Sequence, residues 1–88
     1  MNEALFLSLS HSNKIPTIDL HGSSGIVEAL EKMEKELFSF SKRKDNFVKV
    51  IYGIGEGVLK ERVVESVKNH PLIKSYHIGE DGFCIVEL

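Results

Sequence analysis

Two side chains that can move a proton lie two positions apart in the first strand-like segment of this 88-residue chain. Asp19 and His21 close an apolar run, and the pattern of this run predicts a strand over residues 15–20. Residues i and i+2 of a strand point to the same face, so the carboxylate could orient the imidazole and favour its protonated form. Such a pair suits proton transfer, or one metal ligand and its partner. The structural alternative is that Asp19 satisfies backbone or hydroxyl groups at the strand end and His21 caps the following turn.

A cluster of three glycines follows the second apolar segment, which predicts a strand over residues 47–52. Gly53, Gly55 and Gly57 come directly before a helical pattern. Glycines let a backbone approach a ligand closely, and the free N–H groups at a helix start suit a phosphate. The dinucleotide fingerprint fails because Val58 stands where a glycine is required, and the Walker pattern fails as well. A plain tight turn between strand and helix explains the glycines equally well.

The charge of the chain is uneven and favours an anionic ligand near this glycine cluster. The whole sequence has a net charge of −2, but residues 42–74 hold eight basic and four acidic side chains, a net of +4. Lys49, Lys60 and Arg62 belong to this basic segment, and we predict that they contact phosphates. The alternative is an ordinary charged surface exposed to solvent.

Disulfide and zinc chemistry find no support in the sequence. Cys84 is the only cysteine and lies in an apolar run, which indicates a small buried side chain and excludes an internal disulfide. His11, His70 and His77 lack the spacing of a zinc site. No metal ligand is therefore predicted, and a divalent metal cofactor is left as an open alternative. No apolar run approaches the roughly 20 residues of a membrane span and no signal peptide is apparent, so we expect a cytoplasmic protein.

Two helices that could position these groups follow from hydrophobic periodicity. An apolar stripe at alternating steps of four and three residues predicts the first helix, and its members are Ile26, Leu30, Met33, Leu37 and Phe40. A second stripe, formed by Leu59, Val63 and Val67, predicts a helix that starts at residue 57 or 58. This second helix is expected to end at Asn69, ahead of Pro71.

The strands and helices together predict an α/β fold, a two-layer sandwich with a mixed four-stranded sheet in the order β-α-β-α-β-β. A helix between two strands is a crossover, so the first two strands are expected to be parallel. Asp81-Gly82 predicts a hairpin between the last two strands. The domain should span residues 15–88, and residues 1–14 should form an N-terminal segment or a fifth, edge strand. Two helices would cover one face and leave the other partly open, with Thr17, Asp19, Lys49 and His77 on the open face.

Several motifs in order resemble the small MutS-related (Smr) domain family. Residues 17–22, Thr-Ile-Asp-Leu-His-Gly, with Glu-Ala-Leu at 28–30, are similar to the family's opening motif and helix start. Residues 50–59, Val-Ile-Tyr-Gly-Ile-Gly-Glu-Gly-Val-Leu, are similar to its second motif. His-Pro at 70–71 and the glycines within 79–88 are similar to its closing segment. The resemblance covers nearly the whole chain.

This resemblance implies a domain that acts on DNA or RNA, and no membrane partner. It implies a small endonuclease that nicks DNA or cleaves RNA; the alternative is a non-catalytic binding module with a phosphate-binding glycine loop. The implied catalytic residues are Asp19, His21 and Tyr52, and Tyr52 stands where the family usually has His or Thr. A tyrosine is no general base near neutral pH, because its ordinary pKa is about 10. It can still donate a hydrogen bond to a phosphate or stack on a base.

Overall fold

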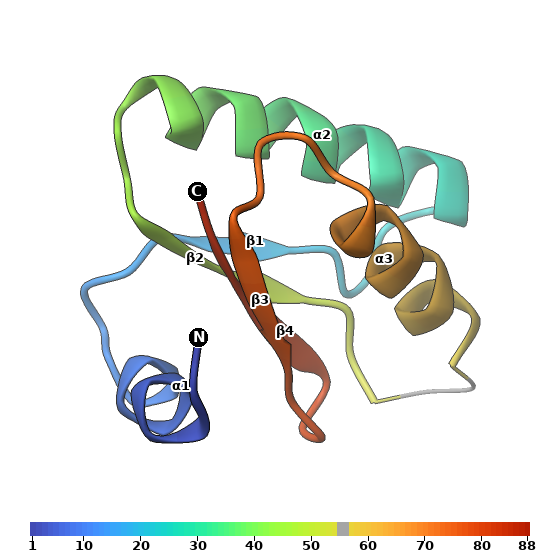
Figure 1. The fold of residues 1–88 in the computed structure, drawn as a ribbon. Helices are drawn as coiled ribbons and strands as arrows, with labels where there is room; N and C mark the ends of the chain where they lie inside the picture. The colour runs from blue at the N-terminus through green and yellow to red at the C-terminus, as the bar shows by residue number, and fades with distance from the viewer. Residues whose placement is uncertain (55–56) are drawn as a thin grey trace.

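The structure is a computed structural model in which residues 1–54 and 57–88 are described. Within these ranges the chain forms three helices and four strands in the order α-β-α-β-α-β-β (Figure 1), which confirms the predicted α/β class. The elements are α1 (Glu3–Ser10), β1 (Thr17–Asp19), α2 (Ile26–Lys42), β2 (Phe47–Ile51), α3 (Val58–Lys68), β3 (Ser75–Ile78) and β4 (Phe83–Glu87). No described helix has both the length and the apolar character needed to cross a membrane.

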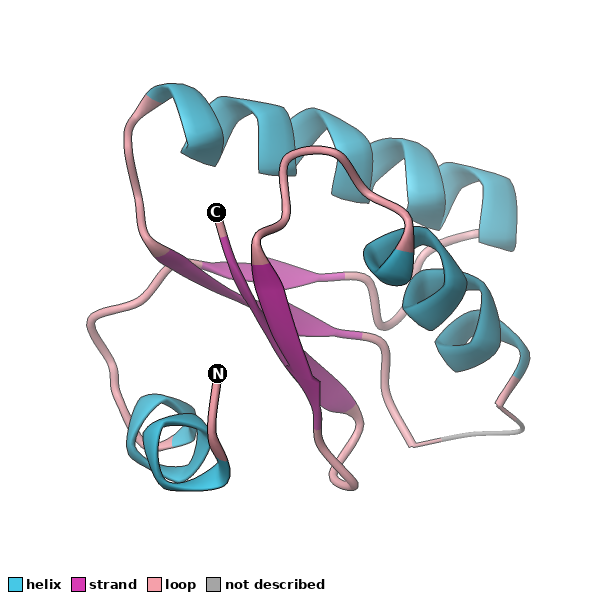
Figure 2. Ribbon diagram, in the orientation of Figure 1, coloured by secondary structure: helices cyan, strands magenta, loops and turns pink. Residues whose placement is uncertain are grey.

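The strands form one mixed sheet in the order β1-β2-β4-β3. β1 and β2 are parallel, as their helical crossover predicts, and Asp19 lies opposite Ile51 at their carboxyl ends. β4 lies between β2 and β3 and is antiparallel to both (Figure 2). Cys84, Ile85 and Val86 of β4 are all fully buried; Cys84 and Val86 belong to the main core, and Ile85 points to the other face. The parallel pair brings the two motif-bearing strand ends to one edge.

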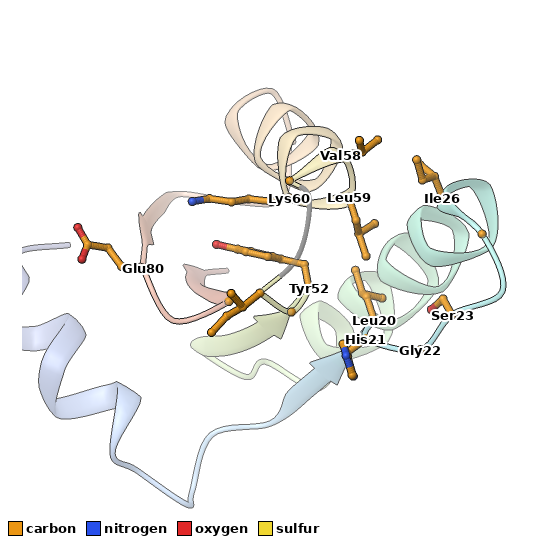
Figure 3. A pocket seen from close by; sticks show the side chains of 15 residues that line it. Leu20, His21, Gly22, Ser23, Ile26, Tyr52, Val58, Leu59, Lys60 and Glu80 are labelled. Carbon is orange, nitrogen blue, oxygen red and sulfur yellow. The ribbon is translucent and has the colours of Figure 1, made fainter.

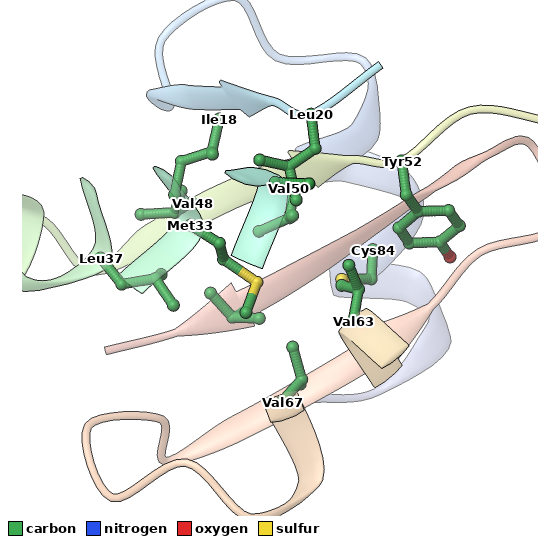
Figure 4. Close-up of a cluster of buried hydrophobic side chains, with 12 residues drawn as sticks. Ile18, Leu20, Met33, Leu37, Val48, Val50, Tyr52, Val63, Val67 and Cys84 are labelled. Atoms are coloured by element: carbon green, nitrogen blue, oxygen red, sulfur yellow. The ribbon is translucent and has the colours of Figure 1, made fainter. Parts of the chain in front are cut away.

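α2 and α3 cover one face of the sheet and form the main core with it (Figure 4). Met33 and Leu37 of the predicted stripe are fully buried, and so is Val63 of α3. Full burial of such a side chain contributes roughly 1.5–3 kcal/mol. The core extends to Leu20 and Tyr52, which lie just past the ends of β1 and β2. Core packing therefore holds in place the segments where the candidate site begins.

For residues 1–14 the two predicted alternatives were an N-terminal segment or an edge strand, and the structure has the helix α1 there in place of a strand. The side chain of Asn2 caps α1 by accepting a hydrogen bond from the Leu5 N–H (2.8 Å). Such a cap satisfies one of the free N–H groups of a helix start and favours helix over strand. Phe6 is the buried residue of α1, so the helix has a single anchor in place of the apolar stripe that a periodicity search detects.

α1 lies on the face of the sheet opposite α2 and α3 (Figure 1), part of which was predicted to be open. The Phe6 ring packs against the tilted His77 ring, with 4.1 Å between ring centroids, and stacks on Phe83 at 5.6 Å. Lys49 Nζ donates a hydrogen bond to the carbonyl oxygen of Ser10 (3.0 Å), at the C-terminal end of α1. Cations favour this end of a helix because its carbonyl groups carry partial negative charge. α1 thus covers Lys49 and His77, two of the four residues expected on an open face.

Candidate functional site

A cavity of about 510 Å³ lies at the carboxyl ends of β1 and β2 (Figure 3). Its walls come from the turn after β1, the first turns of α2 and α3, the end of β2 and the hairpin between β3 and β4. In open α/β sheets, ligands bind outside the carboxyl ends of parallel strands. Five of the residues predicted from the sequence line the cavity: His21, Tyr52, Gly53, Gly57 and Lys60.

His21 is an exposed side chain held in place by its backbone and by Gly53. β1 ends at Asp19, so His21 lies in the turn, where its backbone N–H donates a hydrogen bond to Asp19 Oδ1 (2.9 Å). Asp19 itself is fixed because Lys32 Nζ of α2 donates to its carbonyl oxygen (2.8 Å). Asp19 therefore positions His21 through the main chain. This agrees with the structural alternative given above, in which Asp19 satisfies a backbone group at the strand end.

Gly53 brings the two motifs into contact, because its lack of a side chain makes room for His21. A Cβ built on Gly53 would lie 2.7 Å from His21 Cδ2, and Gly53 has a φ of +89°. Both restrictions favour glycine, which alone accepts positive φ at little cost. On its other side, the Tyr52 and Gly53 N–H groups both donate to the Gly82 carbonyl oxygen (2.9 Å each). Gly53, which follows the end of β2, thus contacts both the His21 imidazole and the β3–β4 hairpin.

Two helix starts face the cavity. Gly25 and Gly57 are the N-cap residues of α2 and α3, both line the cavity, and neither supplies a side-chain cap. The first N–H groups of a helix lack partners within the helix, and the positive end of its dipole attracts anions. Lys60 adds an exposed ammonium group from the first turn of α3. These features suit a phosphate group, in agreement with the pattern of glycines and cations in the sequence.

Tyr52 lines the cavity with its ring while its hydroxyl group has a structural partner. Its side chain is 4% exposed, and the hydroxyl donates a hydrogen bond to the carbonyl oxygen of Phe83 (3.1 Å). Burial, with a contribution from neighbouring Cys84, raises the pKa of Tyr52 to about 12. Burial alone raises the pKa of the Cys84 thiol to about 12. Both groups are therefore neutral near pH 7.

The other predicted site residues lie elsewhere. Arg62 is exposed on α3 and Lys49 is engaged by α1, and neither lines the cavity. Asp19 also stays outside the lining and acts through the His21 backbone. Gly55 lies outside the described residues. Among the described residues, no group of three or more His, Cys, Asp or Glu side chains could hold a metal ion.

Sequence reasoning missed the apolar part of the cavity and one acidic residue. Ile26, Ile54, Val58 and Leu59 line it, and Glu80 from the β3–β4 hairpin lies at its far side from His21 (Figure 3). Ile26 and Leu59 had been read only as members of core stripes. The signal that could have separated them is position, since both lie in the first turn of a helix that follows a motif-bearing strand end.

The Smr domain family model matches residues 18–88, which include every described residue of the cavity. The chain belongs to the Smr domain family. The recognised motifs are thus part of this domain, and α1 precedes the matched region.

Related proteins and a solved structure agree with this family. The chain is 33% identical over 87 residues to Endonuclease MutS2 of Clostridium beijerinckii, a match that covers 93% of this chain and 11% of that protein. Endonuclease MutS2 of Clostridium tetani is 35% identical over 76 residues, with 81% and 10% covered. The chain thus spans about a tenth of the length of these relatives. The crystal structure of the Smr domain of Thermus thermophilus MutS2 has the same fold, with a TM-score of 0.77 at 20% identity, covering 84% of this chain and 98% of that one.

Proposed function

We propose that this Smr domain is a small endonuclease that binds a DNA or RNA phosphate in the cavity and cleaves the phosphodiester bond. The observation that supports this most directly is that His21 and Lys60 line the same cavity as Gly57, the N-cap residue of α3, which has no side-chain cap. The start of α2 contributes less, because the Glu28 carboxylate lies beside its N-cap residue Gly25. The names of the full-length relatives, which are called endonucleases, agree with the proposal.

Each residue has a distinct part in the proposed reaction. Lys60 and the first N–H groups of α3 bind the phosphate oxygens and offset the negative charge that develops during cleavage. His21 takes the proton of the attacking oxygen or gives one to the leaving oxygen, since an imidazole does both near neutral pH. Gly53 and the backbone of Asp19 keep the imidazole at the cavity edge. Tyr52 supplies a wall, because its hydroxyl is bonded to Phe83 and its pKa is about 12.

A second candidate is a binding module without cleavage, and one observation favours it. The Asp19 carboxylate bonds the His21 backbone and not the imidazole, so the two residues do not form the acid–base pair predicted from their spacing. In this case the same phosphate contacts remain and no proton transfer occurs. Lys49 and Arg62 lie outside the cavity and would contact phosphates only of a longer ligand.

The experiment that tests the proposal measures cleavage and binding together. The purified chain is incubated with supercoiled plasmid and with end-labelled single-stranded RNA, in Mg²⁺, in Mn²⁺ and in EDTA. His21→Ala should lower the cleavage rate by about 10²- to 10⁴-fold and leave the mobility shift in place, because a positioned acid or base contributes about that much. A mobility shift without any cleavage by the parent would select the binding module.

The matched control is His11→Ala. His11 is also an exposed histidine, but it follows α1 and does not line the cavity. We expect its cleavage rate to equal that of the parent. Equal losses in the two variants would mean that His21 has no special part in the reaction.

A further inference from the structure

We infer that the cavity seats an unpaired nucleobase, so that the preferred substrates are nucleic acids with single-stranded or unpaired nucleotides. This inference rests on the proposed function, because it places the base next to the phosphate that the cavity is proposed to hold. It specifies the class of nucleic acid, which the phosphate contacts leave undefined.

The first reason is the chemistry of the cavity walls. Figure 3 shows Leu20, Ile26, Val58 and Leu59 gathered between the first turns of α2 and α3. Phosphates are bound by N–H groups and cations and need no apolar wall, whereas the face of a base is a large flat surface that packs well on apolar side chains. The cavity volume of about 510 Å³ also lies within the range of about 300–1,000 Å³ typical of small-molecule sites.

The second reason is that apolar side chains at the cavity are left in water. Ile54 is 84% exposed and Val58 is 51% exposed, and both line the cavity. Single exposed apolar residues are common on proteins. Two on the same cavity, next to cationic phosphate contacts, fit one ligand that is apolar on one side and anionic on the other. A nucleotide has this composition.

The third reason is the small number of cations. Among the described residues, Lys60 and His21 are the basic side chains that line the cavity, and Glu80 opposes them. Binding that depends on the phosphate backbone alone draws its affinity from many cation contacts, for example about six to ten phosphates. With so few cations, contact with the base has to supply part of the affinity. A base stacked inside a duplex does not reach a recessed site, so the base must be unpaired or turned out of the stack.

The experiment compares three hairpin DNAs that share the same duplex sequence: a continuous duplex, the duplex with one inserted unpaired thymidine, and the duplex with an abasic residue inserted at that position. Affinities are measured by fluorescence anisotropy in EDTA at several salt concentrations. We expect the unpaired thymidine to raise the affinity about tenfold over the continuous duplex, and the abasic residue to remove the gain. Equal affinity for all three DNAs would overturn the inference.

Val58→Ser and Val27→Ser form a matched pair of variants. Both valines are exposed in the first turn of a helix, at 51% and 64%, but only Val58 lines the cavity. Val58→Ser should lose most of the tenfold preference and keep the salt dependence, and Val27→Ser should keep both. A preference that survives in Val58→Ser would place the base elsewhere and overturn the inference.

The failures of the two proposals are distinguishable in the same data. Salt-dependent binding with equal affinity for the three DNAs overturns the base site alone and leaves the phosphate contacts standing. Salt-independent binding, or none to any of the three, overturns the proposed function and the base site together. The circular dichroism spectra and thermal unfolding of both serine variants should match those of the parent, since each changes an exposed side chain.

Discussion

The cavity and the face beneath α1 each present one histidine and one lysine, and the two pairs differ in what surrounds them. His21 is exposed against a bare glycine backbone, and Lys60 is exposed in the first turn of α3. His77 stacks on Phe6, and Lys49 donates to the end of α1 while its ammonium lies 4.9 Å from the centre of the Phe83 ring. Whether a histidine or lysine is free to bind a ligand therefore depends on the element that packs against it, and not on the residue type alone.

Among the changes that test this comparison, Gly53→Ala is expected to have the largest effect on activity. The new Cβ would lie 2.7 Å from His21 Cδ2 and displace the imidazole, so we expect a loss of about 10²-fold in cleavage rate. Gly22→Ala is the matched control, because Gly22 has a similar φ of +85° and open space where its Cβ would lie. Equal losses in both variants would show that backbone strain, and not the position of His21, controls the activity.

A smaller effect is expected at alkaline pH. It tests whether the hydroxyl of Tyr52, a residue that lines the cavity, stabilises the fold or takes part in cleavage. Its pKa of about 12 exceeds the ordinary value of 10.0, so the unfolded chain loses this proton first and the free energy of unfolding falls as pH rises through this range. Urea titrations should show that between about pH 10 and 12 the parent loses roughly 1–3 kcal/mol more than Tyr52→Phe, in which the loss from the buried Cys84 thiol remains. Cleavage near pH 7 should change less than twofold. A large loss of activity in Tyr52→Phe would show that the hydroxyl takes part in the cleavage reaction.

Phe6→Ala tests whether the α1 face is structural. Its removal should lower the free energy of unfolding by about 2 kcal/mol, less than the ~3–5 kcal/mol of an enclosed core residue, because a short helix can detach. The cleavage rate at a temperature where the variant is folded should equal that of the parent. A change in the rate would mean that α1 influences the cavity on the other side of the sheet.

The smallest effect concerns the two lysines and the salt dependence of binding. Lys60→Ala should reduce the slope of log affinity against log salt by about 0.9 on duplex DNA, which corresponds to one phosphate contact. Lys49→Ala should leave the slope unchanged, because its ammonium is already bonded to Ser10. If Lys49→Ala reduces the slope and Lys60→Ala does not, then Lys49 contacts a phosphate and Lys60 does not, which is the opposite of what we expect.

The sequence predicted the sandwich well because its main elements obey simple periodicities. The stripe of α2 places Met33 and Leu37 in the core, and the crossover makes β1 and β2 parallel. α1 was missed because its single buried residue, Phe6, makes no stripe and because its start depends on the Asn2 cap. The central position of β4 was also hidden, since strand order depends on contacts between segments far apart in the chain.

The site was predictable where backbone motifs decide it. Parallel strand ends explain why His21 and Gly53 meet, and Gly57, with its φ of +89°, is the N-cap residue of α3. The predicted pairing of Asp19 with the imidazole depended on β1 continuing to His21, but the strand ends at Asp19 and its carboxylate bonds a backbone N–H instead. Strand ends are set by local hydrogen bonds, which spacing alone does not reveal.

The contact between Gly53 and Gly82 limits which residues are tolerated at position 82. A Cβ on Gly82 would lie 2.9 Å from the carbonyl carbon of Gly53, and Gly82 also needs a φ of +83°. The hairpin can accept insertions at its exposed tip, but a substitution at its base would have to push back the strand end next to His21. We therefore expect related sequences to differ in the length of this hairpin more readily than in the residue at position 82. A loop engineered at this place should keep that glycine.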